Sequence, residues 1–307
     1  MILITGATGT VGKELVKLLA RPEEPIRVMV RDRTKAAAIA YPGANIVEGD
    51  LRLSDTLDKA LSGVHKAFLL SPPDERQAEI EGNFVTAAAR SNVKHIVKLS
   101  ALGAAENSPA RLLRGHAETE RRIEESGIPY TFLRPCAFMQ NFLAYRDSII
   151  QRGEFYAPMG GGRVGIVDVR DVAAVAAEVL EEYGHENKVY DVTGPESLSY
   201  ADAAARLTEA LGKPVTYVDV PPEAARDSML QSGMSPWFAD ALLELFALWK
   251  VNAASEIADT VQHVAKKDPI TFAEFAHEYA PQFGRTSRDT LAELMDNVNL
   301  DTMTPGA

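Results

Sequence analysis

The feature that most constrains the fold of this chain is a regular alternation of short apolar segments with segments of helical periodicity. The apolar segments are rich in Val, Ile and Leu. They lie at residues 2–5, 26–31, 45–49, 66–71, 95–100 and 130–135. Near-continuous apolar strands separated by helices are typical of a parallel sheet that is covered on both faces. We therefore predict an α/β fold with a doubly wound parallel sheet, whose ligand cleft lies at the carboxyl ends of the strands.

The alternation becomes less regular beyond about residue 150, which suggests a second unit. We expect residues 1–150 to form the parallel-sheet domain, with strands from 160–194 as candidates to extend it. Residues 151–284 are expected to form a smaller C-terminal α/β lobe that binds substrate. Residues 285–307 are polar, with one weak amphipathic patch, and are typical of a flexible tail.

Charge and composition argue against two classes of partner. The formal net charge is -11 and no basic tract is present, which disfavours a nucleic-acid ligand. No apolar stretch approaches the roughly 20 residues that cross a bilayer, and the first residues run directly into a strand without a basic leader. We therefore expect a cytoplasmic protein with no membrane partner.

Cysteine and histidine usage limits metal and thiol chemistry. Cys136 is the single cysteine, so an intrachain disulfide and a multi-cysteine metal site are ruled out. The sequence around Cys136 offers no evident base, which favours a packing role over a nucleophilic one. No second histidine lies at ligand spacing from His116, and we predict no metal site.

The segment TGATGTVG carries the most specific motif of the chain. Gly6, Gly9 and Gly12 follow the first strand and open the first helix. Glycines in this position let the backbone turn tightly and approach a pyrophosphate, while the amides of the helix N-terminus hold its charge. The amphipathic helix and second strand that follow supply the required context. We therefore predict a Rossmann-like domain that binds a dinucleotide.

The residues after the second and third strands bear on the choice of cofactor. Arg31 ends the second strand and Arg33 lies close by, which favours NADP(H) over NAD(H) because a guanidinium matches a 2′-phosphate. Asp32 could either cap the next helix or accept a hydrogen bond from a ribose. After the third strand, Asp50 could face the adenine amino edge or simply begin a turn, while Leu51 would pack against the ring.

The other end of the cofactor site lacks a familiar catalytic pair. Short-chain reductases normally place a Tyr and a Lys four residues apart on one helix face, and this chain has no such pair. The nearest spacing is Tyr130 to Arg134, but both lie in a strand, where residues four apart are separated by about 13 Å. Alcohol dehydrogenation and sugar-nucleotide epimerisation by a Tyr–Lys pair are therefore disfavoured.

Two other side chains are candidates for a catalytic role. His116 and Glu120 are one helical turn apart, so the carboxylate could orient the imidazole. His116 could then donate a proton or bind the nicotinamide ribose, or it could form only a surface salt bridge. Ser100 ends the fifth strand, where its hydroxyl could bond a carbonyl or ribose oxygen or only complete the strand end. Hydride transfer needs little more than orientation and exclusion of water.

Several segments resemble one known group of proteins. They are TGATGTVG, Arg31 at its strand end, HIVKLSALGA, HAETE, GIPYTFLRPCAFMQNF and GHENKVYDVTG. Over roughly residues 1–280 the chain resembles the NmrA-like branch of the atypical short-chain dehydrogenases/reductases. Within that branch it is most similar to type-2 NADPH:quinone oxidoreductases and triphenylmethane reductases, although these have Asn where this chain has Pro135.

The resemblance implies particular site residues. It implies NADP(H) contacts at Gly6, Thr8, Gly9, Thr10, Val11, Arg31, Leu70, Ser71, Pro135 and Phe138. It also implies that Asn141 and Phe142 border a substrate pocket under the C-terminal lobe.

We therefore expect an NADPH-dependent reductase that transfers hydride to a quinone or a similar small conjugated acceptor. The alternative is a redox sensor of the NmrA type that binds NAD(P) without turnover. The glycine motif is common to both and cannot separate them. The sequence leaves a homodimer open.

Overall fold

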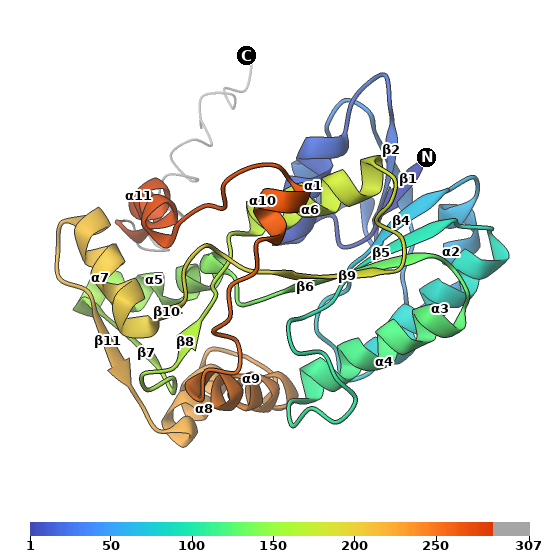
Figure 1. The fold of residues 1–307 in the computed structure, drawn as a ribbon. Coiled ribbons are helices and arrows are strands. Elements are labelled where there is room, and N and C mark those ends of the chain that lie inside the picture. Colours follow the sequence, from blue (N-terminus) through green and yellow to red (C-terminus); the bar gives the residue numbers. More distant parts are fainter. Residues whose placement is uncertain (285–307) are drawn as a thin grey trace, which may run out of the picture.

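The computed structural model describes residues 1–284, and the segment 285–307, predicted as a tail, lies outside them. A seven-stranded parallel sheet in the order β3-β2-β1-β4-β5-β6-β9 forms the centre of the first domain (Figure 1). Its strands are β1 (Ile2–Ile4), β2 (Ile26–Val30), β3 (Ala44–Glu48), β4 (Lys66–Leu69), β5 (His95–Leu99), β6 (Tyr130–Pro135) and β9 (Lys188–Val192). The chain order reverses between β1 and β4, where doubly wound folds open their ligand cleft. The predicted fold class is confirmed.

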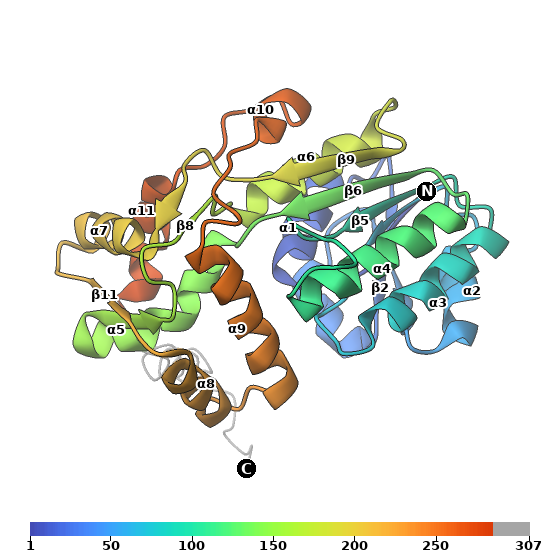
Figure 2. The ribbon, with the colours of Figure 1, turned by 60° about the horizontal axis from the view of Figure 1, so that its bottom comes forward.

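Helices cover both faces of this sheet. One layer contains α1 (Thr10–Leu19) and α6 (Val169–Glu181), and the other contains α2 (Ser54–Leu61), α3 (Gln77–Arg90) and α4 (Arg111–Glu125) (Figure 2). Each layer buries its own apolar core against the sheet. A 3-10 segment, η1 (Arg33–Ile39), follows β2, where the sequence suggested an α-helix. The short α10 (Thr260–Val264) packs on α6 and β9. Helix α6, strand β9 and helix α10, which all come from beyond residue 160, therefore pack with this sheet.

The remaining elements form a smaller α/β lobe with its own core. They are η2 (Met139–Tyr145), α5 (Arg146–Arg152), β7 (Glu154–Ala157), β8 (Arg163–Val164), β10 (Leu198–Ser199), α7 (Tyr200–Leu211), β11 (Thr216–Asp219), α8 (Pro222–Gln231), α9 (Pro236–Lys250) and α11 (Phe272–Phe283). Short two-stranded sheets pair β7 with β11 and β8 with β10. Buried Phe142, Phe155, Tyr200 and Phe272 meet in this core.

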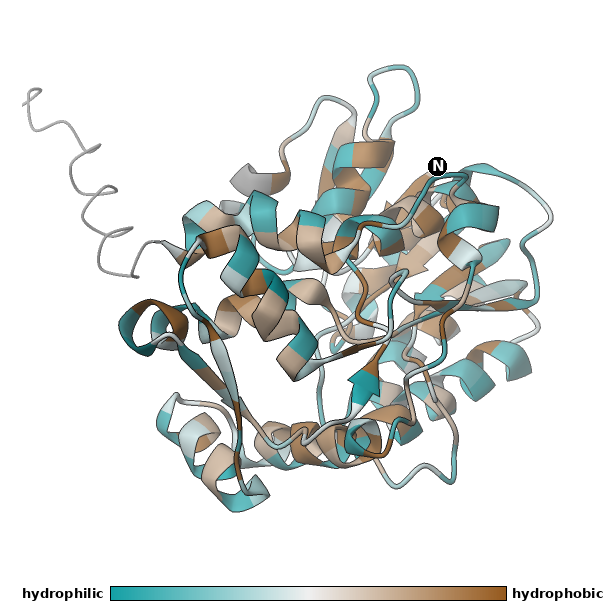
Figure 3. Cartoon of the chain, turned by 60° about the vertical axis from the view of Figure 1, so that its left-hand side comes forward, coloured by the Kyte–Doolittle hydropathy of each residue, from teal (hydrophilic) through white to brown (hydrophobic). Residues whose placement is uncertain are grey.

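Hydropathy follows this layered arrangement. Hydrophobic residues gather in the strands and on inner helix surfaces, whereas the loops and outer helix turns are largely hydrophilic (Figure 3). Among the helices of residues 1–284, none is long and apolar enough to span a membrane.

Candidate nucleotide site and reaction end

The turn between β1 and α1 requires glycine at two positions. Gly6 has a φ of 62°, and a Cβ there would lie 2.7 Å from the Leu70 side chain and 2.8 Å from its carbonyl oxygen. A Cβ on Gly12 would lie 2.2 Å from the carbonyl oxygen of Gly6. Gly9 closes the turn by donating its amide to that same oxygen at 2.9 Å. The helix therefore starts in direct contact with the turn, as the motif predicts.

The N-terminus of α1 has the properties of an anion site. Gly9 is its N-cap and has no side chain that could cap the first amides. Those amides belong to Thr10, Val11 and Gly12, and an α-helix leaves its first amides without intrahelical partners. Their alignment with the helix dipole favours a negative charge in front of them. The turn therefore fits a pyrophosphate.

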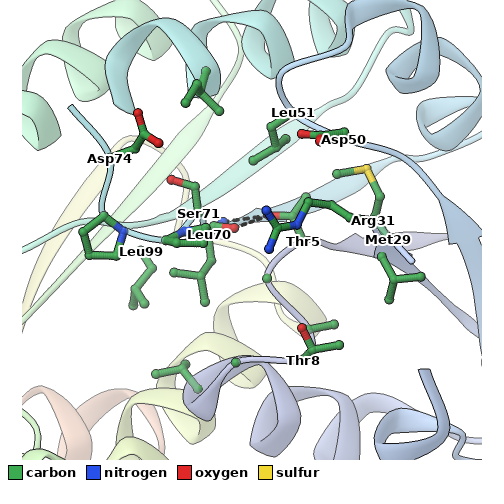
Figure 4. A pocket seen from close by; sticks show the side chains of 18 of the residues that line it. Thr5, Thr8, Met29, Arg31, Asp50, Leu51, Leu70, Ser71, Asp74 and Leu99 are labelled. Carbon is green, nitrogen blue, oxygen red and sulfur yellow. Dashed lines mark hydrogen bonds between the residues drawn. The ribbon is translucent and has the colours of Figure 1, made fainter. Parts of the chain in front are cut away.

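A cleft of about 560 Å³ opens in front of this turn (Figure 4). The ends of β1, β2, β3 and β4 contribute to its wall, so that it lies at the carboxyl edge of the sheet. The predicted residues that line it are Gly6, Thr8, Gly9, Thr10, Val11, Arg31, Asp50, Leu51, Leu70, Ser71 and Phe138. The structure thus brings together residues from five separate segments of the chain.

Thr5 holds two strand ends at the floor of the cleft. Its hydroxyl accepts a hydrogen bond from the Leu70 amide at 2.8 Å and lies 2.9 Å from the Leu70 carbonyl (Figure 4). The hydroxyl is fully buried. Thr5 lies directly between the first strand and the glycine motif, at a strand end where a parallel sheet is expected to form its ligand cleft.

The structure separates the roles of the two residues after β2. Arg31 lines the cleft, and its guanidinium lies inside it (Figure 4). Asp32 accepts hydrogen bonds from the amide of Thr34 at 2.9 Å and from its hydroxyl at 2.6 Å. Of the two roles considered for Asp32, the structure therefore shows the cap of the following turn. Arg31, the residue directly after β2, therefore supplies a positive charge at the cleft.

The end of β3 contributes both to the cleft and to its own turn. Asp50 lines the cleft, and one of its carboxylate oxygens accepts from the Arg52 amide at 2.9 Å. Leu51 is buried beside it. Arg52 forms an ion pair with Asp74 from the loop after β4, and both side chains line the cleft. This pair joins two loops at the cleft, and the sequence analysis missed it.

Six predicted residues lie away from the cleft lining: the catalytic candidates Ser100 and His116, described below, and four residues predicted to bind cofactor or substrate. Gly12 is behind the turn, where it permits the close packing of α1. Pro135 ends β6 and is paired with Val192 of β9. Asn141 is exposed on η2. Phe142 is 2% exposed and packs among the aromatic rings of the lobe core, so its expected place at a substrate pocket stays a prediction.

The expected pair of His116 with Glu120 is not formed. Glu120 instead accepts from the Ser100 hydroxyl at 2.5 Å and from two nitrogens of Arg134, at 3.0 Å and 2.5 Å. The ends of β5 and β6 present these donors to α4, and they engage both carboxylate oxygens. Ser100, 4% exposed, is therefore a buried partner of Glu120 in this structure.

His116 contacts a different polar group. Its Nδ1 lies 3.4 Å from the Lys98 ammonium and 3.3 Å from the Gln77 side-chain nitrogen. Lys98 and Glu81 are both fully buried and are 3.0 Å apart. Burial and the charge of Lys98 hold the pKa of His116 well below its usual value. The sequence carried one signal for this arrangement, a lysine inside the apolar strand HIVKLS.

The single cysteine belongs to the core of the C-terminal lobe. Cys136 is buried, and burial raises the pKa of its thiol to about 12. Within residues 1–284, no group of three or more His, Cys, Asp or Glu side chains could hold a metal ion.

A doubly wound parallel sheet with an uncapped glycine turn at its topological switch point defines a Rossmann-type dinucleotide-binding protein. The comparison with family models narrows this class. The model of the NmrA-like family matches residues 1–276, and the chain belongs to that family. The family predicted from the sequence is thereby confirmed.

Characterised relatives cover nearly the whole chain. An NAD(P)H azoreductase of Xenophilus azovorans is 43% identical over 284 residues, which is 92% of this chain and 99% of that protein. The structure of the NADPH-dependent quinone oxidoreductase of Escherichia coli in complex with NADPH is 32% identical and has a TM-score of 0.83, covering 91% and 99% of the two chains. The Citrobacter sp. triphenylmethane reductase complexed with NADP(H) is 30% identical with a TM-score of 0.81, covering 91% and 100%.

Proposed function

We propose that this protein reduces small, planar, conjugated acceptors, namely quinones and azo compounds, with NADPH. It is an NAD(P)H-dependent oxidoreductase of the NmrA-like family, and its relatives include a quinone oxidoreductase, an azoreductase and a triphenylmethane reductase. The observation that carries the proposal is the cleft, in which an uncapped helix N-terminus and Arg31 offer two sites for phosphate groups.

Different residues of the cleft bind different parts of the cofactor in this proposal. The turn at residues 6–12 holds the pyrophosphate, and Arg31 at the end of β2 pairs with the 2′-phosphate. Leu51 and Asp50 border the adenine. Ser71, Leu99 and Phe138 line the cleft on the side of β4, β5 and β6, and these residues would border the nicotinamide half.

The proposed reaction is a hydride transfer from the bound cofactor to the acceptor. NADPH supplies a hydride, and one proton from water completes the reduction of a quinone to its hydroquinone. The chain itself needs to orient the acceptor, exclude water and polarise the acceptor oxygen. The C-terminal lobe, whose core contains Phe142, Phe155, Tyr200 and Phe272, is the part of the chain that we propose closes over the acceptor. This arrangement needs no Tyr–Lys pair, because the acceptor is already electrophilic.

The test is a stoichiometric assay of NADPH oxidation with menadione, benzoquinones, an azo dye and a cationic triphenylmethane dye. We expect turnover with at least one quinone or azo compound, and one hydroquinone formed per NADPH oxidised. Tight binding of NADP(H) without oxidation by any acceptor would overturn the enzyme assignment and support a redox sensor.

A further inference from the structure

A buried chain of polar groups runs from the wall of the nucleotide cleft to His116. Ser71 lines the cleft, and its hydroxyl donates to Glu81 of α3 at 2.8 Å. The same carboxylate oxygen of Glu81 lies 3.0 Å from the ammonium of Lys98 on β5. Lys98 in turn faces Nδ1 of His116 on α4 at 3.4 Å. Three separate elements therefore contribute to one contiguous network.

Each of the three N–H donors of Lys98 has a partner in the structure. An ammonium group has three N–H donors and no acceptor. In this structure it faces the Glu81 carboxylate, the backbone carbonyl of Leu99 and the ring nitrogen of His116. Because Lys98 can only donate, Nδ1 of His116 must carry a lone pair. The side-chain nitrogen of Gln77 also faces this Nδ1, at 3.3 Å.

Stability alone is a poor explanation for this network. Burying an ion pair costs desolvation that its attraction only partly offsets. One oxygen of Glu81 has no hydrogen-bond partner among the described residues, so the carboxylate is not even fully satisfied. By contrast, the network meets the cleft at both Ser71 and Leu99, on the side of the switch point where the nicotinamide half would lie.

We propose that Lys98 is a positioning residue that fixes His116 as the neutral tautomer with its proton on Nε2, so that His116 presents a hydrogen-bond donor at the reaction end. The catalytic use of this donor rests on the reductase function proposed above. The assignment of the tautomer is independent of that function. The groups that face His116 are Lys98 from β5 and Gln77 from α3, and Lys98 is in turn paired with Glu81 of α3. On its own helix, Glu120 is held by Ser100 and Arg134.

This assignment decides between the two catalytic roles considered for His116. A ring with its lone pair held toward an ammonium does not readily accept a second proton, and burial acts in the same direction. His116 therefore does not supply a proton as an imidazolium. It polarises an acceptor oxygen or a ribose oxygen through its Nε2–H, while the proton of the overall reaction comes from water.

The first measurement is made on the wild-type protein and needs a variant only to assign the signal. Protein labelled with ¹⁵N-histidine is examined by long-range ¹H–¹⁵N correlation between pH 5.5 and 8, with and without NADP⁺, and the His116→Asn spectrum assigns the signal. We expect an unprotonated Nδ1 and a protonated Nε2 throughout this range. A proton on Nδ1, or a ring that becomes doubly protonated within the range, would overturn the proposal.

A second measurement tests the origin of the tautomer. The double variant Lys98→Met/Glu81→Gln removes both buried charges together, which avoids leaving one unpaired. We expect its His116 signal to show mixed tautomers and a pKa that moves upward, and kcat to fall about tenfold with the KM for NADPH within twofold. Lys94→Met, an exposed lysine just before β5, is the matched control and should behave like the wild type.

The outcomes separate the two proposals. If the tautomer is as expected but no acceptor is reduced, the reductase function fails and the network assignment stands. If turnover is normal but the double variant leaves both the tautomer and the pH profile unchanged, Lys98 has no positioning role.

Discussion

Glu244 of α9 caps the first turn of α4 by binding Arg111. The Arg111 amide donates to one oxygen of Glu244 at 2.7 Å, and two guanidinium nitrogens donate to the other at 2.9 Å and 2.6 Å. The N-cap residue of α4 is Ala110, which has no side-chain acceptor. A carboxylate of the C-terminal lobe thus caps a helix that packs on the seven-stranded sheet. This contact joins the lobe to the N-terminal end of α4.

The first prediction concerns this cap. Replacing Glu244 with Ala removes the cap and the paired carboxylate, and we expect a loss of about 1–2 kcal/mol in the free energy of unfolding. Asp240→Ala is the matched control, because Asp240 lies one turn away on α9 and forms its hydrogen-bonded ion pair with Arg226 at the surface. Urea denaturation of both variants tests this, and an equal loss for the two would contradict the interlobe role.

The effect of Glu244 should also depend on pH. Burial alone would raise the pKa of Glu244, but the hydrogen bonds from Arg111 outweigh it and the pKa lies below its usual value. A carboxylate whose pKa is depressed by folding stabilises the folded state above its unfolded pKa, about 4.3, and loses this contribution as the pH falls through the folded value. The difference between wild type and Glu244→Ala should therefore shrink below about pH 4.

The second prediction concerns the glycine turn. An alanine at position 12 would place its Cβ 2.2 Å from the Gly6 carbonyl oxygen, so α1 must move away from the turn. We expect Gly12→Ala to cost about 1–3 kcal/mol of stability and to weaken NADPH binding at least tenfold. Gly161→Ala is the control, because a Cβ there meets nothing within 4 Å. If calorimetry gave Gly12→Ala the same affinity for NADPH as the wild type, the proposed role of the glycine turn in pyrophosphate binding would be contradicted.

The third prediction concerns selection of the cofactor. Arg31 lines the cleft, and a charged hydrogen bond to a 2′-phosphate is worth about 1.5–3 kcal/mol. We expect Arg31→Ala to raise the KM for NADPH tenfold or more and to change the KM for NADH by less than threefold. Arg33, two residues further, is outside the cleft lining and provides the control variant. Equal effects on the two cofactors would refute the phosphate contact.

The fourth prediction concerns a buried histidine of β5. His95 is 2% exposed, and Nε2 faces the Thr131 hydroxyl at 2.8 Å. Thr131 gives its own proton to the carbonyl of His185 at 2.6 Å, so His95 must donate from Nε2. Burial, helped by the charge of Lys66, lowers the pKa of His95 to about 4. The folded protein therefore keeps this ring neutral under conditions where the unfolded chain protonates it.

The sign of the pH effect follows. Between about pH 6.5 and pH 4 the unfolded chain binds a proton that the folded state does not, so stability falls as the pH falls through this window. The loss amounts to roughly 3 kcal/mol at its lower end. We expect His95→Gln to remove this slope, as measured by urea midpoints at pH 7 and 4.5. The exposed His263→Gln should retain it.

Most of the fold could be predicted because its signals are local. Each apolar strand and each amphipathic helix is encoded within a short window, and the parallel arrangement follows from their alternation. The start of α4 shows where such signals end. The sequence indicates a helix around His116 and Glu120, but the helix begins at Arg111, where its cap comes from a residue 133 positions away.

The sequence by itself determined the nucleotide turn, because a tight approach of backbone to backbone admits only glycine, and Gly6 and Gly12 stand at those positions. It also placed Arg31 at the cleft, because strand ends of a parallel sheet share one edge. The tertiary structure alone decided the partners of the candidate catalytic residues. Glu120 binds Ser100 and Arg134 across three elements, and Lys98 faces His116. Hydrogen bonds between buried side chains depend on which elements pack together, and spacing along one helix cannot reveal that.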